Sequence, residues 1–253
     1  MTVFHIDRKK AILSVLKKHE TATVQELVDA TGASESTIRR DLTDLESQQL
    51  IKRLHGGASL SKRKMEEPSM SEKESVNQTE KQAIAQAAST FVEHRHCLFI
   101  DAGTSTIELI PFLHNKEVIV VTNGIHHVPL LLENGIETYV TGGKAKPHTA
   151  ALTGDKAVES VEAFRFDICF LGMNGVDGRQ GFTTPDPEEA VVKKTAMSLA
   201  AQSYVLADHS KIGEVSFASV ASVDQAAIVT TNKVDEHTLQ QLQQETAVKV
   251  VNL

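Results

Sequence analysis

Cysteine is scarce in this chain, and long apolar runs are missing. Only Cys97 and Cys169 occur among its 253 residues, both inside apolar strand-like runs. We therefore expect buried thiols in a reducing compartment, with no disulfide framework and no metal site. No apolar run approaches the ~20 residues that span a bilayer, and residues 1–10 lack the pattern of a secretory signal. These absences predict a cytoplasmic protein without a membrane partner, and nothing in the sequence indicates a cofactor.

Charge is unevenly distributed along a chain that is long enough for two domains. Residues 1–64 hold 12 Lys+Arg and 8 Asp+Glu, a charge of +4, whereas the rest of the chain holds 14 and 25, a charge of −11. A basic head on an acidic protein suggests local contact with a polyanion. A charge of +4 does not by itself establish DNA binding, so the residue pattern inside the head has to decide.

The head carries the start and stop signals of three short helices. Asp7 is a suitable N-cap for the first. Thr23 and Glu26 form a capping box for the second, and Gly32 supplies its left-handed end. Ser34 is the natural N-cap of the third. Two helices separated by a short turn that contains glycine predict a helix-turn-helix.

The third helix has a free polar face. Ile38, Leu42 and Leu45 fall on one side at helical spacing and form its inward face. The opposite side carries Ser36, Arg40, Thr43 and Ser47, and Thr37 and Arg39 flank it. Arginine bonds guanine edges in bidentate fashion, and serine and threonine donate to phosphates or bases, so this face suits the major groove.

Residues 50–60 read as a two-stranded wing around Gly56-Gly57, which permit a primed turn. The imperfect alternation leaves open which of its basic residues point outward. Basic residues that merely solvate a small helical domain are the alternative, and the agreement of caps, turn, apolar spacing and wing argues against it. The predicted DNA-binding residues are Thr23, Ser34, Ser36, Thr37, Arg39, Arg40, Lys52, Arg53 and His55.

The chain divides into a DNA-binding domain over 1–60, a charged linker over 61–78 and a second domain over 79–253. A capping box at Thr79 and Gln82 predicts that a helix opens the second domain. Helices are then expected at 124–134, 154–163 and 187–201, and strands at 97–101, 117–122, 137–141, 166–171, 203–208 and 225–231. Several strands are almost continuously apolar, which is typical of a parallel sheet covered on both faces. The fold class is therefore a winged helix-turn-helix followed by a doubly wound α/β domain.

Small and polar residues follow the predicted strands of the second domain. Ligands of doubly wound folds bind beyond the carboxyl ends of the strands. The loop at 103–106 offers a glycine, three hydroxyls and free N–H groups, which suit a phosphate. Simple turn chemistry explains one such loop equally well, but five strand ends share this character. The predicted effector-binding residues are Asp101, Gly103, Thr104, Ser105, Thr106, Thr122, Asn123, Thr141, Gly142, Gly143, Lys144, Asn174, Glu189 and Lys211.

The run SESTIRRDLTDLESQQLIKRLHGGA resembles the N-terminal signature of the DeoR family of bacterial repressors. The resemblance continues through the Gly-Thr-Ser-Thr loop at 103–106, the glycine-rich turn at 172–175, the acidic helix start at 188–189 and the run at 207–211. It implies a recognition helix with Ser36, Thr37, Arg39 and Arg40, a wing around Arg53 and His55, and a sensor domain similar in fold to ribose-5-phosphate isomerase.

Carried over by position, the resemblance implies that Gly103–Thr106 hold a phosphate and that Asp101, Asn174, Glu189 and Lys211 surround the sugar. Within the family, the runs GMNGVDGRQGFTTPDPEEA and VLADHSKIGEVSFA look most like repressors of fructose-utilisation operons of Gram-positive bacteria, which implies fructose 1-phosphate as inducer. Tagatose, galactitol and other phosphosugar repressors share most of these motifs.

The leading hypothesis is a repressor, acting as a dimer or tetramer on two half-sites, that a sugar phosphate releases from operator DNA. A sugar-phosphate isomerase with a DNA-binding head is the alternative enzyme, although GMNGVD lacks the acidic cluster of the isomerase. A third reading is an adaptor whose head binds protein. No catalytic residue is assigned, and the His126–His127 pair is expected at the surface of a helix.

Overall fold

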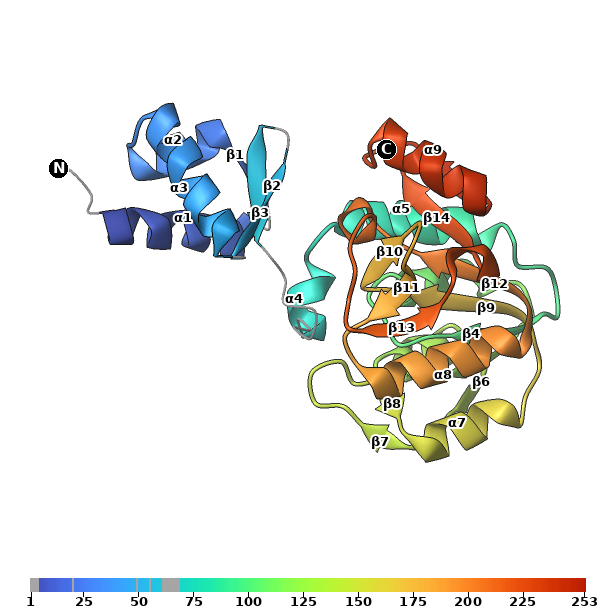
Figure 1. The fold of residues 1–253 in the computed structure, drawn as a ribbon. Coiled ribbons are helices and arrows are strands. Elements are labelled where there is room, and N and C mark those ends of the chain that lie inside the picture. The colour runs from blue at the N-terminus through green and yellow to red at the C-terminus, as the bar shows by residue number, and fades with distance from the viewer. Residues whose placement is uncertain (1–4, 20, 49, 55, 61–68) are drawn as a thin grey trace. The chain divides into compact units, whose positions relative to one another are not determined.

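The computed structural model describes residues 5–19, 21–48, 50–54, 56–60 and 69–253. The chain divides into two compact units, Met1–Arg63 and Lys64–Leu253 (Figure 1). No helix in the described ranges is both long and apolar enough to cross a membrane.

The first unit is a winged helix-turn-helix. Its elements are α1 (His5–His19), β1 (Thr21–Thr23), α2 (Val24–Thr31), α3 (Glu35–Ser47), β2 (Ile51–Leu54) and β3 (Gly57–Leu60). The three strands form an antiparallel sheet in the order β1-β3-β2. The predicted inward residues Ile38, Leu42 and Leu45 lie in one core with Ile12 and Leu27. The helix-turn-helix and its wing are therefore confirmed.

Local capping fixes the helix boundaries of this unit as expected. Thr23 and Glu26 form the capping box of α2, Gly32 ends that helix at φ +67°, and Ser34 accepts the Thr37 N–H at the start of α3. The two glycines of the wing have different roles. The turn lies at Gly56, whereas Gly57 opens β3 so close to β1 that a Cβ there would lie 2.3 Å from the Ala22 carbonyl oxygen. Only glycine allows this approach of two backbones.

The second unit is built on a seven-stranded parallel sheet in the order β15-β14-β12-β9-β4-β5-β6. The strands are β4 (Cys97–Ile100), β5 (Ile119–Thr122), β6 (Glu137–Val140), β9 (Phe166–Gly172), β12 (Ala200–Leu206), β14 (Ala227–Thr231) and β15 (Val248–Val251). The chain starts in the middle at β4, adds β5 and β6 on one side, and then returns to the other side of β4 for β9 and the rest. This is the doubly wound order, and its direction reverses between β4 and β9.

Helices cover both faces of the sheet. One face packs against α5 (Gln78–Ser89), the 3₁₀ helix η1 (Ile107–Phe112) and α6 (His127–Glu133), and the other against α7 (Asp155–Glu162), α8 (Pro187–Ser198) and α9 (Glu236–Glu245). Figure 1 shows α7 and α8 together on one side and α5 on the other. Alternate strand residues serve the two cores. On β4, Phe99 lies in the core beside α7, α8 and α9, whereas Leu98 and Ile100 lie in the core beside α5, η1 and α6.

Smaller elements add to the frame of the second unit. Strands β10 (Gly175–Asp177), β11 (Gly181–Thr184) and β13 (Ala218–Ala221) form an antiparallel sheet that packs on α8, and β7 (Lys144–Ala145) pairs with β8 (Leu152–Thr153). The short 3₁₀ helices η2 (His209–Lys211) and η3 (Val223–Gln225) complete this part. The sequence did not predict these elements, β15 or α9.

Three expectations need correction. The capping box at Thr79 and Gln82 was wrong, because α5 begins at Gln78 with Asn77 as N-cap in a left-handed conformation. Part of the expected linker is folded, since α4 (Met70–Glu74) lies within it and buries Met70. Cys169 is buried as expected, but Cys97, the first residue of β4, is partly exposed.

Candidate nucleic-acid interface and effector site

Helix α3 exposes the predicted polar face. Ser36, Arg40 and Thr43 are exposed, opposite the buried Ile38 and Leu42. Within the described chain, the side chain of Arg40 makes no hydrogen bond or ion pair. Arg39 is also exposed, but its guanidinium bonds Glu35 one turn earlier at 2.6 Å and 2.9 Å. Arg40 is therefore the arginine of this face that is most free to reach another molecule.

A buried ion pair holds this helix against α1. Asp41 lies inside the apolar stripe of α3 and is 1% exposed. Arg8 donates to its two carboxylate oxygens at 2.5 Å and 3.2 Å, and Lys9 bonds Asp44 at 3.3 Å. A bidentate pair fixes both distance and orientation. The sequence analysis missed it, although an acidic residue in an apolar stripe is the signal that could have revealed it.

Other predicted DNA-binding residues hold the head together. The Thr23 and Ser34 hydroxyls cap α2 and α3, and the half-buried Thr37 hydroxyl lies 2.8 Å from that of Ser34. Arg53 bridges the wing to α3, since its Nη1 donates to the Arg39 carbonyl at 3.3 Å and the Thr43 hydroxyl at 3.4 Å. Lys52 is exposed on the same strand, and His55 lies outside the described residues.

The predicted effector loop follows β4 at the point where the strand order reverses. The Gly172 N–H, at the end of the neighbouring strand β9, donates to Asp101 Oδ2 at 3.2 Å. A Cβ on Gly103 would lie 3.2 Å from the Thr106 hydroxyl and 4.0 Å from the Gly172 Cα. The tight contact is the one with Thr106, so glycine at position 103 leaves room for the Thr106 hydroxyl inside the loop.

Hydrogen bonds fold the loop at 103–106 into a fixed shape. Asn123 accepts the Ala102 N–H at 2.9 Å, and the Thr106 hydroxyl donates to the Asp101 carbonyl at 2.5 Å with the Gly103 carbonyl 3.0 Å away. Within the described residues, the backbone N–H groups of 103–106 have no hydrogen-bond acceptor. Consecutive unpaired N–H groups after a strand form a cradle for an anion.

His127 contacts this loop from the interior of the protein, contrary to the expectation that it lies at the surface. Its side chain is fully buried, and Nε2 lies 3.2 Å from the Thr106 hydroxyl. Burial lowers the pKa of His127 to about 3, so the ring is neutral near pH 7. Nothing in the sequence around His126 and His127 indicated that His127 is buried.

Two lysines that the sequence analysis did not select neutralise the buried carboxylates of the rim. Lys193 of α8 bonds Asp101 and also donates to the Gly172 carbonyl at 3.0 Å. Lys146 lies 2.7 Å from Glu189 and 2.8 Å from Asp186. Burial raises the pKa of Asp101, and the Lys193 ammonium opposes that shift. The arrangement suits the binding of a polar ligand beside a paired set of charges.

The remaining predicted effector residues lie along the same sheet edge at different depths. The Thr122 hydroxyl is occupied, because it donates to the Ile100 carbonyl at 2.6 Å and accepts the Gly124 N–H at 3.0 Å. Thr141 is buried at the end of β6, whereas Gly142, Gly143 and Lys144 beyond it are exposed. Asn174 is half-buried and accepts the Thr184 hydroxyl at 3.1 Å.

Lys211 lies beyond the end of β12, two strands away from β4. It belongs to η2, and it counteracts the effect of burial to keep the pKa of Asp208 below its usual value. Strand β9 separates β12 from β4, so the two ends are about 10 Å apart at two strand spacings.

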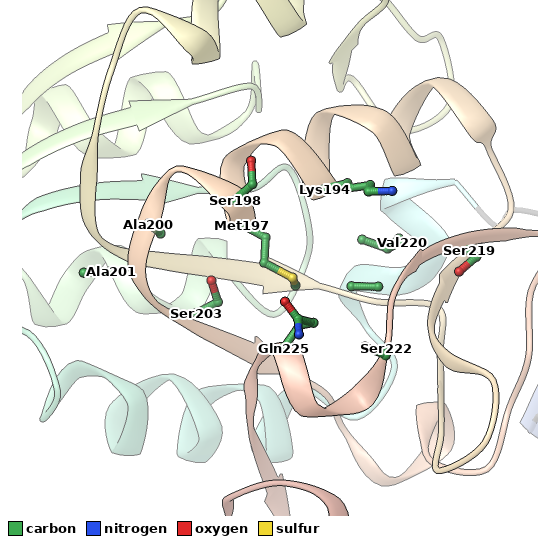
Figure 2. Close-up of a pocket in the computed structure, with 11 residues that line it drawn as sticks. Lys194, Met197, Ser198, Ala200, Ala201, Ser203, Ser219, Val220, Ser222 and Gln225 are labelled. Carbon is green, nitrogen blue, oxygen red and sulfur yellow. The ribbon is translucent and has the colours of Figure 1, made fainter.

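An open groove of about 720 Å³ lies away from this rim (Figure 2). It is lined by the end of α8, the start of β12, β13 and η3, with Lys194, Ser198, Ser219 and Gln225 among its polar residues. No predicted effector residue lines it. Because the start of β12 lines the groove, the groove lies toward the amino end of that strand, whereas the rim lies at the carboxyl ends.

Comparison with known proteins identifies both units. Residues 8–64 match the DeoR-like helix-turn-helix domain, and residues 76–233 match the DeoR C-terminal sensor domain. Among solved structures, a ribose 5-phosphate isomerase A from Methanocaldococcus jannaschii matches at a TM-score of 0.41 with 17% identity, over 53% of this chain and 54% of that one. The fold class itself rests on the strand order described above.

Curated relatives match over almost the whole chain. The HTH-type transcriptional regulator FruR of Bacillus subtilis is 44% identical over 97% of this chain and 98% of its own. GlpR of Haloferax volcanii is 36% identical over 89% of each chain, and the lactose phosphotransferase system repressor of Streptococcus mutans is 33% identical over 96% of this chain and 98% of its own. All three are transcriptional regulators and not enzymes. The chain therefore belongs to the DeoR family of DNA-binding transcriptional regulators.

Proposed function

We propose that this protein represses a sugar-utilisation operon and that a sugar phosphate, fructose 1-phosphate, releases it from the operator. The name of the FruR relative supports fructose, and the name of the Streptococcus mutans relative supports repression. In this proposal the protein acts in the cytoplasm as a dimer or tetramer, because a repressor with a helix-turn-helix binds two half-sites of an operator.

One observation carries the effector proposal. The N–H groups of residues 103–106 have no acceptor among the described residues, and the loop that carries them is held by Asn123, Thr106 and His127. A preformed cradle binds a phosphate without an ordering cost at the moment of binding. The hydroxyls of Thr104 and Ser105 add two donors to the same loop.

The sugar is proposed to lie beside this loop along the strand ends. Asn174, Glu189 and Lys211 are polar groups of the neighbouring strand ends and of α8, and Lys144 follows β6 on the other side. Hydroxyl groups of a sugar both donate and accept, so amide, carboxylate and ammonium groups recognise them together. Asp101 is proposed to act through Lys193, which holds its carboxylate.

The operator is proposed to contact α3 and the wing. Ser36, Thr37, Arg39 and Arg40 would face bases and phosphates of the major groove, and Lys52, Arg53 and His55 a neighbouring phosphate strand. Release follows from linkage, because an effector that prefers a conformation with wrongly spaced heads weakens operator binding by the same free energy. A tenfold loss of affinity requires about 1.4 kcal/mol.

The test is operator binding, measured by fluorescence anisotropy, with fructose 1-phosphate, other sugar phosphates, fructose and inorganic phosphate. We expect fructose 1-phosphate to raise the operator Kd and unphosphorylated fructose to have no effect. Ser105→Asp places a negative charge in the cradle and should abolish the response, while Ser198→Asp, on the exposed end of α8, should keep it. A wild type that responds to no sugar phosphate would refute the proposal.

A further inference from the structure

The first helices of the sensor unit form a corner that is tied together. We name residues 69–81, which contain α4 and the start of α5, the α4–α5 corner. Ser69 caps α4 in a capping box with Glu72, the Val76 N–H donates to the Lys73 carbonyl at 3.3 Å, and the Lys81 ammonium of α5 donates to that same carbonyl. The α4 helix and the start of α5 are therefore bonded to each other, and they are the part of the sensor unit that follows the head in the chain.

One end of the corner is fixed by a buried carboxylate. Glu80 is fully buried and accepts from the Thr231 hydroxyl at 2.7 Å, the Lys233 ammonium at 3.0 Å, and His209 at 2.8 Å from Nδ1 and 3.3 Å from the backbone N–H. Although burial opposes it, the bonds from Thr231 and Lys233 keep the pKa of Glu80 below its usual value. A buried charge with this many donors sets the position of its helix closely.

Asn77 adds a second bond to the same region. Its side-chain amide donates to Asp208 Oδ1 at 2.9 Å, and that oxygen also accepts the Ser210 N–H at 3.0 Å. Asp208 is the N-cap of η2, and Ser210 lies within η2 next to Lys211. The start of α5 is therefore bonded to the segment that carries a predicted effector residue.

The other end of the corner contacts a different part of the rim. The Met70 N–H donates to the His148 carbonyl at 2.9 Å, and the Met70 side chain is buried. His148 belongs to the turn at 146–150, whose Lys146 and Thr149 bond Glu189 at 2.7 Å and 3.0 Å. One end of the corner is therefore bonded to the segment that contains Lys211, and the other end is bonded to the turn whose side chains bond Glu189.

We infer that Asn77 and Glu80 are positioning residues that couple the effector site to the DNA-binding head: a shift of η2 on effector binding moves the start of α5 and, with it, the chain that leads to the head. This inference rests on the proposed function. It assigns the coupling to two residues of the sensor unit and requires neither of them to touch the effector or the operator.

The test separates binding from coupling in the full-length protein. Wild type, Asn77→Ala, Glu80→Gln and the control Glu245→Gln are compared, since Glu245 is an exposed residue of α9. Three quantities are measured for each: the operator Kd, the fructose 1-phosphate Kd by calorimetry, and the operator Kd at saturating fructose 1-phosphate. The ratio of the two operator Kd values is the coupling, which a merely structural role would leave unchanged.

We expect wild type and Glu245→Gln to show a coupling of about tenfold or more, within the usual range for allosteric proteins. Asn77→Ala and Glu80→Gln should keep both single Kd values while the coupling falls toward one. If both variants keep the wild-type ratio, the inference is wrong although the proposed function stands. If Glu80→Gln fails to fold, Asn77→Ala decides, because its half-buried side chain loses one bond. A wild type without any response to sugar phosphates refutes both.

Discussion

The exposed face of α3 and the polar rim of the sensor sheet differ in the chemical groups that they present to a ligand. On α3, Arg40 and Ser36 extend into solvent from a helix that is held from behind by Arg8 and Asp41. At the rim, Asp101 and Glu189 are buried and paired with Lys193 and Lys146, and the backbone N–H groups of 103–106 have no acceptor among the described residues. One surface offers flexible side chains, and the other offers a rigid backbone.

This difference matches the size of the two proposed ligands. A duplex spreads its charge over many phosphates, so long side chains at a surface can each find one. A sugar phosphate concentrates its charge on a single group that fits a loop of backbone donors. The comparison predicts that substitutions at the rim act mainly on folding and effector response, whereas those on α3 act on DNA affinity.

The largest expected effect is at the rim. Lys193→Met leaves Asp101 buried without its ammonium partner, and this should lower the free energy of unfolding by about 3–5 kcal/mol in urea titrations. Lys156→Met, on the exposed face of α7, is the control and should change little. The double variant Asp101→Asn with Lys193→Met should recover most of the loss. A single variant as stable as wild type would show that the rim charges are not coupled.

On α3 the expected loss is in affinity. Arg40→Ala should weaken operator binding by about 1–3 kcal/mol and relax the sequence preference at one position, with unfolding unchanged. Arg179→Ala, an exposed arginine of the sensor unit, serves as the matched control in the same anisotropy assay. Unaltered operator binding by Arg40→Ala would mean that the reading face has been assigned wrongly.

Acid should lower the stability of the sensor unit through the buried ring of His127. Its pKa is 6.5 when unfolded and about 3 when folded, so below pH 6.5 the unfolded chain takes up a proton that the folded chain does not. The neutral ring therefore contributes stability above pH 6.5 that is lost as the pH falls toward 3. Between pH 7.5 and 5.5 this loss is about 1.4 kcal/mol.

The measurement is urea unfolding of wild type and His127→Asn at both pH values. The stability difference between the two proteins should shrink by this amount at pH 5.5, because the asparagine does not titrate. A difference that is independent of pH would show that folding does not change the pKa of His127.

The smallest effect is expected at a helix cap of the head. Ser34→Ala removes the acceptor of the Thr37 N–H and should cost about 1 kcal/mol of stability. Ser14→Ala, at an exposed position of α1, is the control. Circular dichroism should show the head melting earlier while the transition of the sensor unit stays in place. Equal melting of the two serine variants would contradict the role of the cap.

The head could be predicted from sequence nearly in full because its signals are local. Capping at Thr23 and Ser34, the glycine after α2 and the apolar spacing of α3 each act within one or two turns of chain. The Arg8–Asp41 pair, which joins residues 33 positions apart, was missed. For the sensor unit, the apolar runs predicted six of the seven parallel strands.

The charge pairing of the rim could not be predicted in this way. Asp101 meets Lys193 from 92 positions away, and Lys146 meets Glu189 from 43. Such pairs depend on which strands become neighbours, and the polar pattern of a single segment does not contain that information. His127 was misjudged for the same reason, since its burial follows from the packing of α6 under a loop that ends another strand.

The reversal between β4 and β9 has a consequence for the order in which the protein becomes functional. The head is complete after about sixty residues, whereas the strand that flanks the loop at 103–106 arrives only with residues 166–172. Domains fold in the order in which they are synthesised. A chain that stops before Phe166 therefore contains the elements of the head and lacks the strand beside the loop at 103–106. We expect such a truncation to keep a folded head whose affinity for DNA no sugar phosphate changes.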